Sequence, residues 1–255
     1  MLRVGVTGHR TDQLAGAEMP ALRARAGQVL QAVAKGAGGP GIVLSPLDRG
    51  EASFALDWDW SRFSPAIIGN AVCTPELHHA GHHHFGGMRL ALQKLIARGC
   101  RRIAAVIEGE VNERARRAWS AAFLEHHPSR GSARRWLQAI DTVDARSLRR
   151  WLKTMKPDAL ITTRDMLLRL EKAGITVREE VDETVLLNWT PASPEYGGID
   201  QCEEVIAAHA VDLVVGQLHH NECGAPEHVK MLLFPGKWAE ARPRTEKQLI
   251  GANDH

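Results

Sequence analysis

Long apolar runs are absent from this sequence. In its 255 residues, no stretch approaches the ~18–20 consecutive apolar residues that a membrane-spanning helix needs. The first ten residues, MLRVGVTGHR, also lack the pattern of a secretory signal peptide, because Arg3 interrupts their apolar run and His9-Arg10 follows too soon. These absences argue against a membrane-spanning or a secreted protein, and we expect a cytoplasmic one with no membrane partner.

Strong net charge and paired cysteines are also missing. The net charge is +2, which is too small to indicate binding to nucleic acid or to an anionic membrane. The four cysteines, at positions 73, 100, 202 and 223, form no Cys-x-x-Cys pair, so we expect reduced thiols. Apolar residues make up 44% and charged residues 24%. This balance is typical of a globular protein, and the length suffices for one large α/β domain or two lobes.

Motifs that would identify an enzyme are absent as well. The sequence has no Gly-x-Ser-x-Gly, no P-loop lysine and no kinase motif set. The stretch GAGGPG (36–41) has the glycine spacing of a dinucleotide fingerprint, but a helix is expected before it and a strand after it, which reverses the required order. The turn VTGHR (6–10) follows a strand and is either a phosphate-binding turn or, as we favour, a surface turn. We therefore predict no catalytic residue and no cofactor.

Histidines are concentrated in one segment, PELHHAGHHHFGG (75–87), which places five of them between positions 78 and 84. His78 and His82 are four residues apart, and His82 and His84 are two apart, which are spacings that suit zinc. The segment is expected to run from a strand into a helix, however, so neither spacing falls on regular structure. The only nearby acid is Glu76, and no His-Glu-x-x-His is present. We favour solvated or pocket-lining histidines over a metal site. A metal- or nucleotide-dependent enzyme using the His78–His84 cluster is the less favoured alternative.

Segments typical of strands and helices alternate along the chain. Strands are predicted at 2–7, 41–47, 65–72, 102–108, 158–163, 184–189 and 229–236, and helices at 19–36, 85–99, 113–127, 147–155, 164–174 and 199–221. Such alternation indicates parallel βαβ units, and therefore an α/β fold. The polar tail, 243–255, is expected to fray.

Four segments resemble parts of the LacI/GalR-type transcription regulators, in the order that those proteins have them. They are LALQKLIARGCRRIAAV (90–106), PDALITTRDMLLRLEKAGITV (157–177), VIAAHAVDLVVGQLHHNECGAP (205–226) and LLFPGKW (232–238). Cys100 stands where the family usually has histidine, and Arg178 where it usually has proline. Each segment is a weak signal alone, but the four in order over residues ~41–242 are specific.

The resemblance implies a periplasmic-binding-protein type I fold, in which two Rossmann-like lobes with parallel sheets are joined by three crossovers. A small-molecule effector then binds in the cleft between the lobes, and the core forms a homodimer. We expect the first lobe at 1–107 plus 194–228 and the second at 108–193 plus 229–242. The predicted function is the effector-binding and dimerisation core of a LacI-type regulator, not an enzyme, with a sugar or other small polar effector. A free-standing sugar-binding protein is the alternative.

Two features depart from the family pattern. The helix-turn-helix signature of the family is not found, and LRVGVT (2–7) corresponds to the second strand of the first lobe. The first lobe is therefore expected to be truncated, and this chain to bind no specific DNA. The helix that the family uses for dimerisation has Arg89, Gln93 and Lys94 on its outer face, which is more polar than a permanent interface prefers.

The resemblance also indicates ligand-binding residues. His83 and His84 fall where the family often has Asp-Asn. Asn188 and Trp189 fall where the family commonly has an Asp-rich strand end that binds sugar hydroxyls. The arginine that lines the ligand cleft in the family corresponds to Arg114 or Arg116. Asp165 is either a ligand contact at a strand's carboxyl end or a helix N-cap. The predicted binding set is His83, His84, Arg114, Arg116, Asp165, Asn188 and Trp189, without a metal. This polar set favours a neutral, polyhydroxylated ligand.

Overall fold

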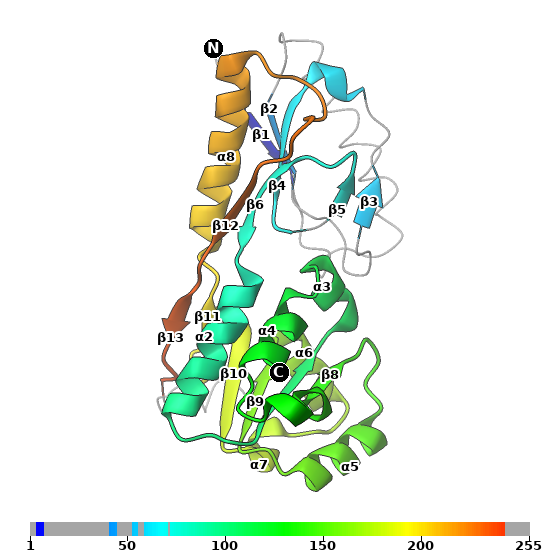
Figure 1. Cartoon of the computed structure of the whole chain (residues 1–255), viewed down its shortest axis with the longest axis vertical. Coiled ribbons are helices and arrows are strands. Elements are labelled where there is room, and N and C mark those ends of the chain that lie inside the picture. The colour runs from blue at the N-terminus through cyan, green and yellow to red at the C-terminus, as the bar shows by residue number, and fades with distance from the viewer. Residues whose placement is uncertain (1–3, 8–40, 45–52, 56–58, 71, 243–255) are drawn as a thin grey trace, which may run out of the picture. The chain divides into compact units, whose positions relative to one another are not determined.

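The computed structural model describes residues 4–7, 41–44, 53–55, 59–70 and 72–242 of the chain (Figure 1). The chain divides into two compact units. The first comprises Met1–His82 and Cys202–Phe234, and the second comprises His83–Gln201 and Pro235–His255. The chain therefore passes from one unit to the other three times. The predicted helix 19–36, the turn residues His9 and Arg10, and the tail 243–255 lie outside the described residues.

The helices and strands of the two units are as follows. The first unit contains β1 (Val4–Thr7), β2 (Gly41–Leu44), β3 (Ser53–Ala55), η2 (Trp60–Arg62), β4 (Ser64–Ile68), β5 (Val72–Thr74), β6 (His78–His82), α8 (Glu203–His220) and β12 (Met231–Phe234). The second contains α2 (His84–Ala97), β7 (Ile103–Ile107), α3 (Gly109–Arg114), α4 (Ala118–His126), η3 (Arg130–Trp136), β8 (Leu137–Ala139), α5 (Ala145–Met155), β9 (Ala159–Thr162), α6 (Arg164–Lys172), α7 (Val177–Glu180), β10 (Glu183–Trp189), β11 (Gly197–Asp200) and β13 (Lys237–Ala239).

The sheet of the first unit has the strand order β1-β2-β4-β6-β12, and all of its pairings are parallel. Helix α8 covers one face, where Ile206, Ala210 and Val214 pack against residues of β2, β4 and β6. The helix approaches closely at Gly41, where an added Cβ would come within 2.2 Å of Val214 Cγ1. Glycine at the start of β2 therefore permits α8 to lie against the sheet.

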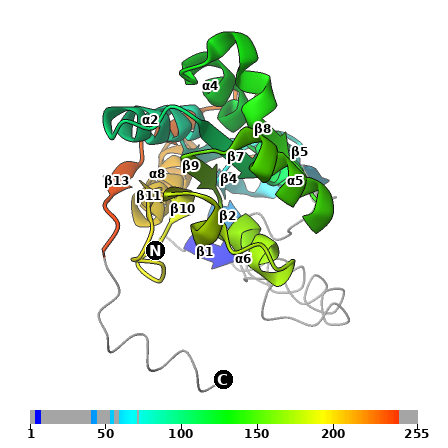
Figure 2. The same ribbon diagram turned by 90° about the horizontal axis from the view of Figure 1, so that it is seen from below.

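The sheet of the second unit has the order β13-β11-β10-β9-β7-β8, and only the pairing of β13 with β11 is antiparallel. Along β7, Ile103, Ala105 and Ile107 face the core shared with α2 and α4, whereas Ala104 and Val106 face the core shared with α5 and α6. Figure 2 shows α2 and α4 on one side of this sheet and α6 on the other. Burial on both faces explains why β7 is a continuous apolar run.

The α/β fold with parallel sheets is confirmed, but the predicted lobe boundaries are wrong. Strand β7 and helix α2 belong to the second unit, and β12 belongs to the first, because β7 pairs with β8 and β9 and β12 pairs with β6. Accordingly, α8 packs against β2, β4 and β6 and not against β7. Apolar patterning reveals that a segment is a strand but not which sheet it joins, and this is the reason for the error.

Two local predictions also need correction. The helix predicted at 113–127 is two helices, α3 and α4, because Arg116 and Arg117 have φ of 52° and 57°, which no helix interior allows. The segment 78–82 is a fully buried strand, β6, whose polar histidines concealed it in the sequence. Among the described residues, no helix is long and apolar enough to span a membrane.

Candidate functional site

Polar side chains gather where the parallel strands of the second sheet end. Glu108 directly follows β7, Thr163 and Asp165 follow β9, Asn188 lies at the end of β10, and Gln201 follows β11. The carboxyl ends of parallel strands meet at one edge of a sheet, which is where open α/β sheets bind ligands. We call this region, formed by the residues that follow β7, β9, β10 and β11, the carboxyl edge.

A buried acid forms the base of the carboxyl edge. Glu108 is only 2% exposed, and both of its carboxyl oxygens lie 2.7 Å from Thr163 Oγ1, which donates to them. Burial raises the pKa of Glu108, while the hydrogen bond from Thr163 opposes that rise. Glu108 was not among the predicted residues, because it ends an apolar run and was counted as part of the strand. Its contact with Thr163 joins the ends of β7 and β9.

The first turn of α6 is held by two side chains. Thr163 is the N-cap, and its Oγ1 accepts a hydrogen bond from Met166 N at 3.1 Å. Asn188 Oδ1 accepts one from Arg164 N at 2.8 Å. Asp165 lies within this turn and is not the N-cap, which removes that alternative. An acid in the first turn is also favoured by the helix dipole. Asp165 and Asn188, two of the predicted residues, are therefore brought to the same place.

Trp189 and Gln201 extend the carboxyl edge along β10. The indole Nε1 of Trp189 donates to Tyr196 O at 3.0 Å, and its half-buried ring packs against the core beneath α5 and α6. Gln201 Nε2 donates to Leu187 O at 2.9 Å. Both side chains are held by main-chain carbonyls, so their positions are defined before any ligand arrives. Gln201 lies outside every recognised motif, so it could not be predicted from the sequence.

The two candidate arginines lie in the segment that follows Glu108. Arg114 is the last residue of α3 and is half-buried, whereas Arg116 is exposed and has a left-handed backbone. The next residue, Arg117, pairs with Glu113 at 2.7 Å. Both candidates therefore lie on the chain that leaves the carboxyl edge.

The two candidate histidines begin α2. His83 is its N-cap residue, and its ring lies over the first turn, since a Cβ added to Gly86 would come within 2.6 Å of His83 Nδ1. The ring of His84 meets that of Trp119 edge-on, with centroids 4.9 Å apart. The other end of α2 lies at the amino edge of the sheet, because Arg98 contacts Glu183 at 3.1 Å. The helix start, with both histidines, therefore points toward the carboxyl edge.

The remaining histidines of the cluster lie in β6, in the first unit. His78, His79 and His82 are all at most 3% exposed. A search of the described residues finds no group of three or more His, Cys, Asp or Glu side chains that could hold a metal ion.

Comparison with known proteins identifies the fold. No family model and no curated protein matches the sequence, but many solved structures do. A periplasmic binding protein/LacI transcriptional regulator from Alkaliphilus metalliredigens QYMF, complexed with D-xylulofuranose, is 17% identical with a TM-score of 0.55. That alignment covers 84% of this chain and 80% of the other.

Two further similar structures have related descriptions. The transcriptional regulator CelR in complex with cellobiose is 18% identical with a TM-score of 0.56, covering 88% of this chain and 69% of that one. The lac repressor dimer bound to operator and the anti-inducer ONPF is 16% identical with a TM-score of 0.55, covering 93% and 92%. The chain thus has the fold of LacI-type regulators and type I periplasmic binding proteins, as its sequence motifs indicated.

Proposed function

We propose that this chain is the effector-binding core of a LacI-type transcription regulator, and that it binds a sugar or similar small polar molecule at the carboxyl edge of the second sheet. The observation that carries the proposal is the network of Glu108, Thr163 and Asn188, which fixes the ends of three neighbouring strands. Fixed polar groups at this position suit ligand recognition. Similar solved structures that hold D-xylulofuranose and cellobiose support the ligand class.

The chemistry of the carboxyl edge suits a polyhydroxylated ligand. The Asp165 carboxylate can accept hydrogen bonds from sugar hydroxyls, and Asn188 keeps its Nδ2 amide for donation because Oδ1 is already used by Arg164 N. The half-buried Trp189 ring offers an apolar face to a pyranose. In the proposed function Arg114, Arg116, His83 and His84 contribute to the rim of the site, and no catalytic step is required.

The regulation proposed is by linkage. An effector that binds one conformation of the protein more tightly shifts the population toward that conformation. The size of the shift is limited by the difference between the effector's affinities for the two conformations. We propose that the chain acts in the cytoplasm as a homodimer, as the lac repressor structure is a dimer. Sedimentation at micromolar concentration tests this, with a dimer expected and a monomer at every concentration as the contrary result.

A thermal-shift screen of monosaccharides and disaccharides tests the ligand class. At least one sugar should raise the melting temperature of the wild-type protein. Asp165→Asn should abolish the shift, because it removes the charged acceptor. Asp182→Asn is the matched control, since Asp182 is exposed before β10 at the other end of the sheet. A panel in which only divalent metals or nucleotides raise the melting temperature would contradict the proposal and favour an enzyme.

A further inference from the structure

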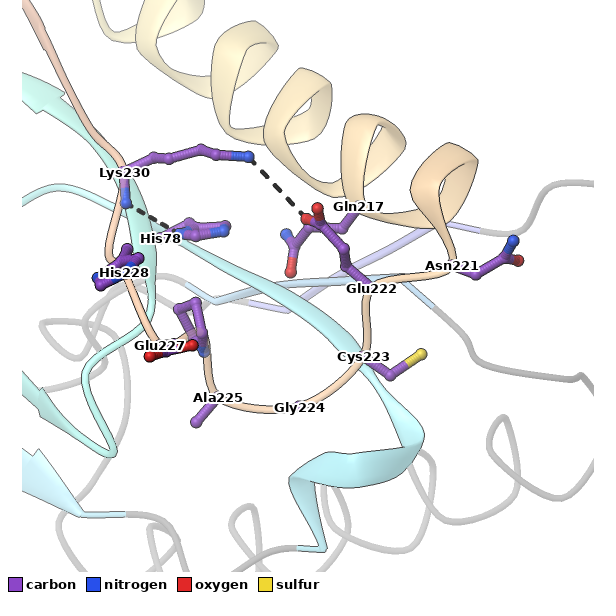
Figure 3. Close-up of a pocket in the computed structure, with 11 residues that line it drawn as sticks. His78, Gln217, Asn221, Glu222, Cys223, Gly224, Ala225, Glu227, His228 and Lys230 are labelled. Carbon is purple, nitrogen blue, oxygen red and sulfur yellow. Dashed lines mark hydrogen bonds and ion pairs between the residues drawn. The ribbon is translucent and has the colours of Figure 1, made fainter.

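The first unit has a cavity of its own at the amino edge of its sheet (Figure 3). It has a volume of about 530 Å³ and lies where α8 ends and where β6 and β12 begin. This volume is within the range of ~300–1,000 Å³ that is usual for small-molecule sites. The cavity lies at the amino edge of the first sheet, whereas the site proposed above lies at the carboxyl edge of the second, so the two do not share residues. We call it the amino-edge cavity.

Two buried side chains point unused polar atoms toward the amino-edge cavity. His78 is 2% exposed, and its Nδ1 accepts a hydrogen bond from Lys230 N at 3.0 Å. The proton of the neutral ring is therefore on Nε2, which has no hydrogen-bond partner among the described residues. Burial is the main cause that lowers the pKa of His78, followed by the charge of Lys230, so the ring is neutral at pH 7. Nε2–H is thus a fixed donor.

The matching acceptor comes from α8. Gln217 is 3% exposed, and its Nε2 donates to Pro65 O at 3.0 Å and to Leu213 O at 3.1 Å. With both amide protons used, the orientation of the amide is fixed, and Gln217 lines the cavity. Within the described part of the chain no donor reaches Oε1. Neither Gln217 Oε1 nor His78 Nε2 is among the fully buried side-chain atoms without a partner, so both can be reached from the cavity by water or by a ligand.

A charge of each sign lies at the rim. Lys230 Nζ and Glu222 Oε2 are 3.9 Å apart, and their side chains are 57% and 49% exposed. An exposed pair at this separation contributes little stability, so a ligand can displace it at small cost. Figure 3 shows Lys230 and His78 on one side of the space, with Glu222 and Gln217 on the other. The cation and the donor are therefore together, and so are the anion and the acceptor.

The loop that carries Glu222 is firmly anchored. Ser64 Oγ donates to Glu222 O at 2.7 Å, and Glu222 N donates to Gln217 O at 2.9 Å. Gly224 N donates to Phe63 O at 2.8 Å, and Gly224 has a φ of 95°, which favours glycine. These bonds tie the loop to the start of β4 and to the end of α8, so the anionic side of the cavity is preorganised for binding.

We propose that the amino-edge cavity is a second ligand site that binds a small zwitterion of the α-amino acid type. The ligand carboxylate would accept hydrogen bonds from His78 Nε2–H and Lys230, and its ammonium group would donate to Gln217 Oε1 and Glu222. A compact zwitterion matches two opposite charges that lie 3.9 Å apart, whereas a neutral sugar offers neither of them an opposite charge. The volume of the cavity leaves room for an amino-acid side chain.

Calorimetric titration of the full chain tests this site. L-alanine and L-glutamine should bind at millimolar concentration, and at least one should move the ¹⁵N resonance of His78 Nε2. Ethylamine, which lacks the carboxylate of alanine, and L-lactate, which lacks its ammonium group, should each bind at least about fivefold more weakly. Equal binding of L-alanine, ethylamine and L-lactate would overturn the proposal, as would the absence of heat and of any change at His78.

Two rim variants and a control locate the binding. Lys230→Met and Glu222→Gln should each weaken binding of the amino acid about five- to tenfold, with folding checked by circular dichroism. His228→Ala changes an exposed lining residue outside the charge pair and should leave binding unchanged. Full affinity in both rim variants, or binding of a neutral sugar here that does not depend on Lys230, would overturn the assignment. Neither outcome bears on sugar binding at the carboxyl edge, which Asp165→Asn tests separately.

Discussion

The carboxyl edge of the second sheet and the amino-edge cavity of the first unit satisfy their buried polar groups differently. At the carboxyl edge, Glu108 and Thr163 are bonded to each other, and Asn188 is bonded to the backbone of α6. In the amino-edge cavity, His78 and Gln217 each use one polar end internally and leave the other unpaired within the described structure. The bonded groups of the first region fix the strand ends beside the proposed sugar site, whereas those of the second leave a donor and an acceptor for a ligand. Substitutions of Glu108 and Thr163 should therefore affect stability, and substitutions in the amino-edge cavity should affect binding.

The largest effect is expected at Thr163. Thr163→Val removes the donor to the buried Glu108 and the N-cap of α6, and should lower the free energy of unfolding by about 2–4 kcal/mol. Thr163→Ser keeps the hydroxyl, so its free energy of unfolding should fall much less. Denaturant unfolding of both variants measures the difference. Equal stabilities would mean that the hydroxyl network does not fix the carboxyl edge.

Acidification should destabilise the protein through its buried neutral histidines. His127 is 1% exposed, donates from Nε2 to Ile103 O at 2.9 Å, and accepts at Nδ1 from Ser129 N at 3.0 Å. Burial lowers the pKa of His127 and of His78 below 6.5. Below pH 6.5 the unfolded chain therefore takes up protons that the folded chain does not, so this stability, present at higher pH, is lost as the pH falls.

Urea unfolding between pH 5 and pH 8 (about the range over which histidine titrates) measures this dependence. The contribution of His127 to the free energy of unfolding, measured as the difference from His127→Gln, should be level above pH 6.5 and fall below it. The raised pKa of Glu108 acts in the opposite direction and is common to both proteins. His127→Gln cannot titrate and should reduce the slope, even if it also lowers stability overall. An unchanged slope in this variant would show that His127 does not contribute to the pH dependence of stability.

A smaller effect is expected at Asn188. Asn188→Ala removes the acceptor for Arg164 N, and the loss should be about 1 kcal/mol because water can reach the first turn of a helix. Asn188→Asp keeps an oxygen acceptor and should retain the stability, while its lost amide protons should weaken sugar binding. Thermal unfolding with and without sugar distinguishes the two roles. Unchanged sugar binding in both variants would remove Asn188 from the site.

The smallest effect is expected from an ion pair at the opposite edge of the same sheet. Arg98 and Glu183 are 3.1 Å apart, with side chains 32% and 38% exposed. Glu183→Gln should therefore change the free energy of unfolding by less than about 1 kcal/mol, and less still at high salt. Denaturant unfolding at low and high salt checks this. A loss as large as that of Thr163→Val would show that stability does not depend on the carboxyl edge in particular.

The parallel α/β fold could be predicted because burial leaves a clear pattern. The strand β7 is an apolar run buried on both faces, and its neighbours in the sheet, β9 and β10, read in the same way. The choice of pairing partner leaves no such pattern in the sequence, because β12 would be equally apolar whichever of the two sheets it joined. The position of β6 was concealed because its buried residues include three histidines.

The candidate site could be predicted in part. Asp165 and Asn188 could be proposed because they follow recognisable strands, and both lie at the first turn of α6. Glu108 was missed because a single acid after an apolar run gives no sign of burial. Gln217 is bonded to Pro65 and His78 to Lys230, and each of these two bonds spans 152 residues of sequence. Local patterning therefore carries no information about the amino-edge cavity.

One measurement tests the account most directly: the shift in melting temperature caused by the best sugar of the screen, compared in wild-type protein, Asp165→Asn and Lys230→Met. The sugar should stabilise the wild-type protein and Lys230→Met equally and should leave Asp165→Asn unchanged, because it binds at the carboxyl edge and not in the amino-edge cavity. Stabilisation of Asp165→Asn to the wild-type extent, together with its loss in Lys230→Met, would contradict the account.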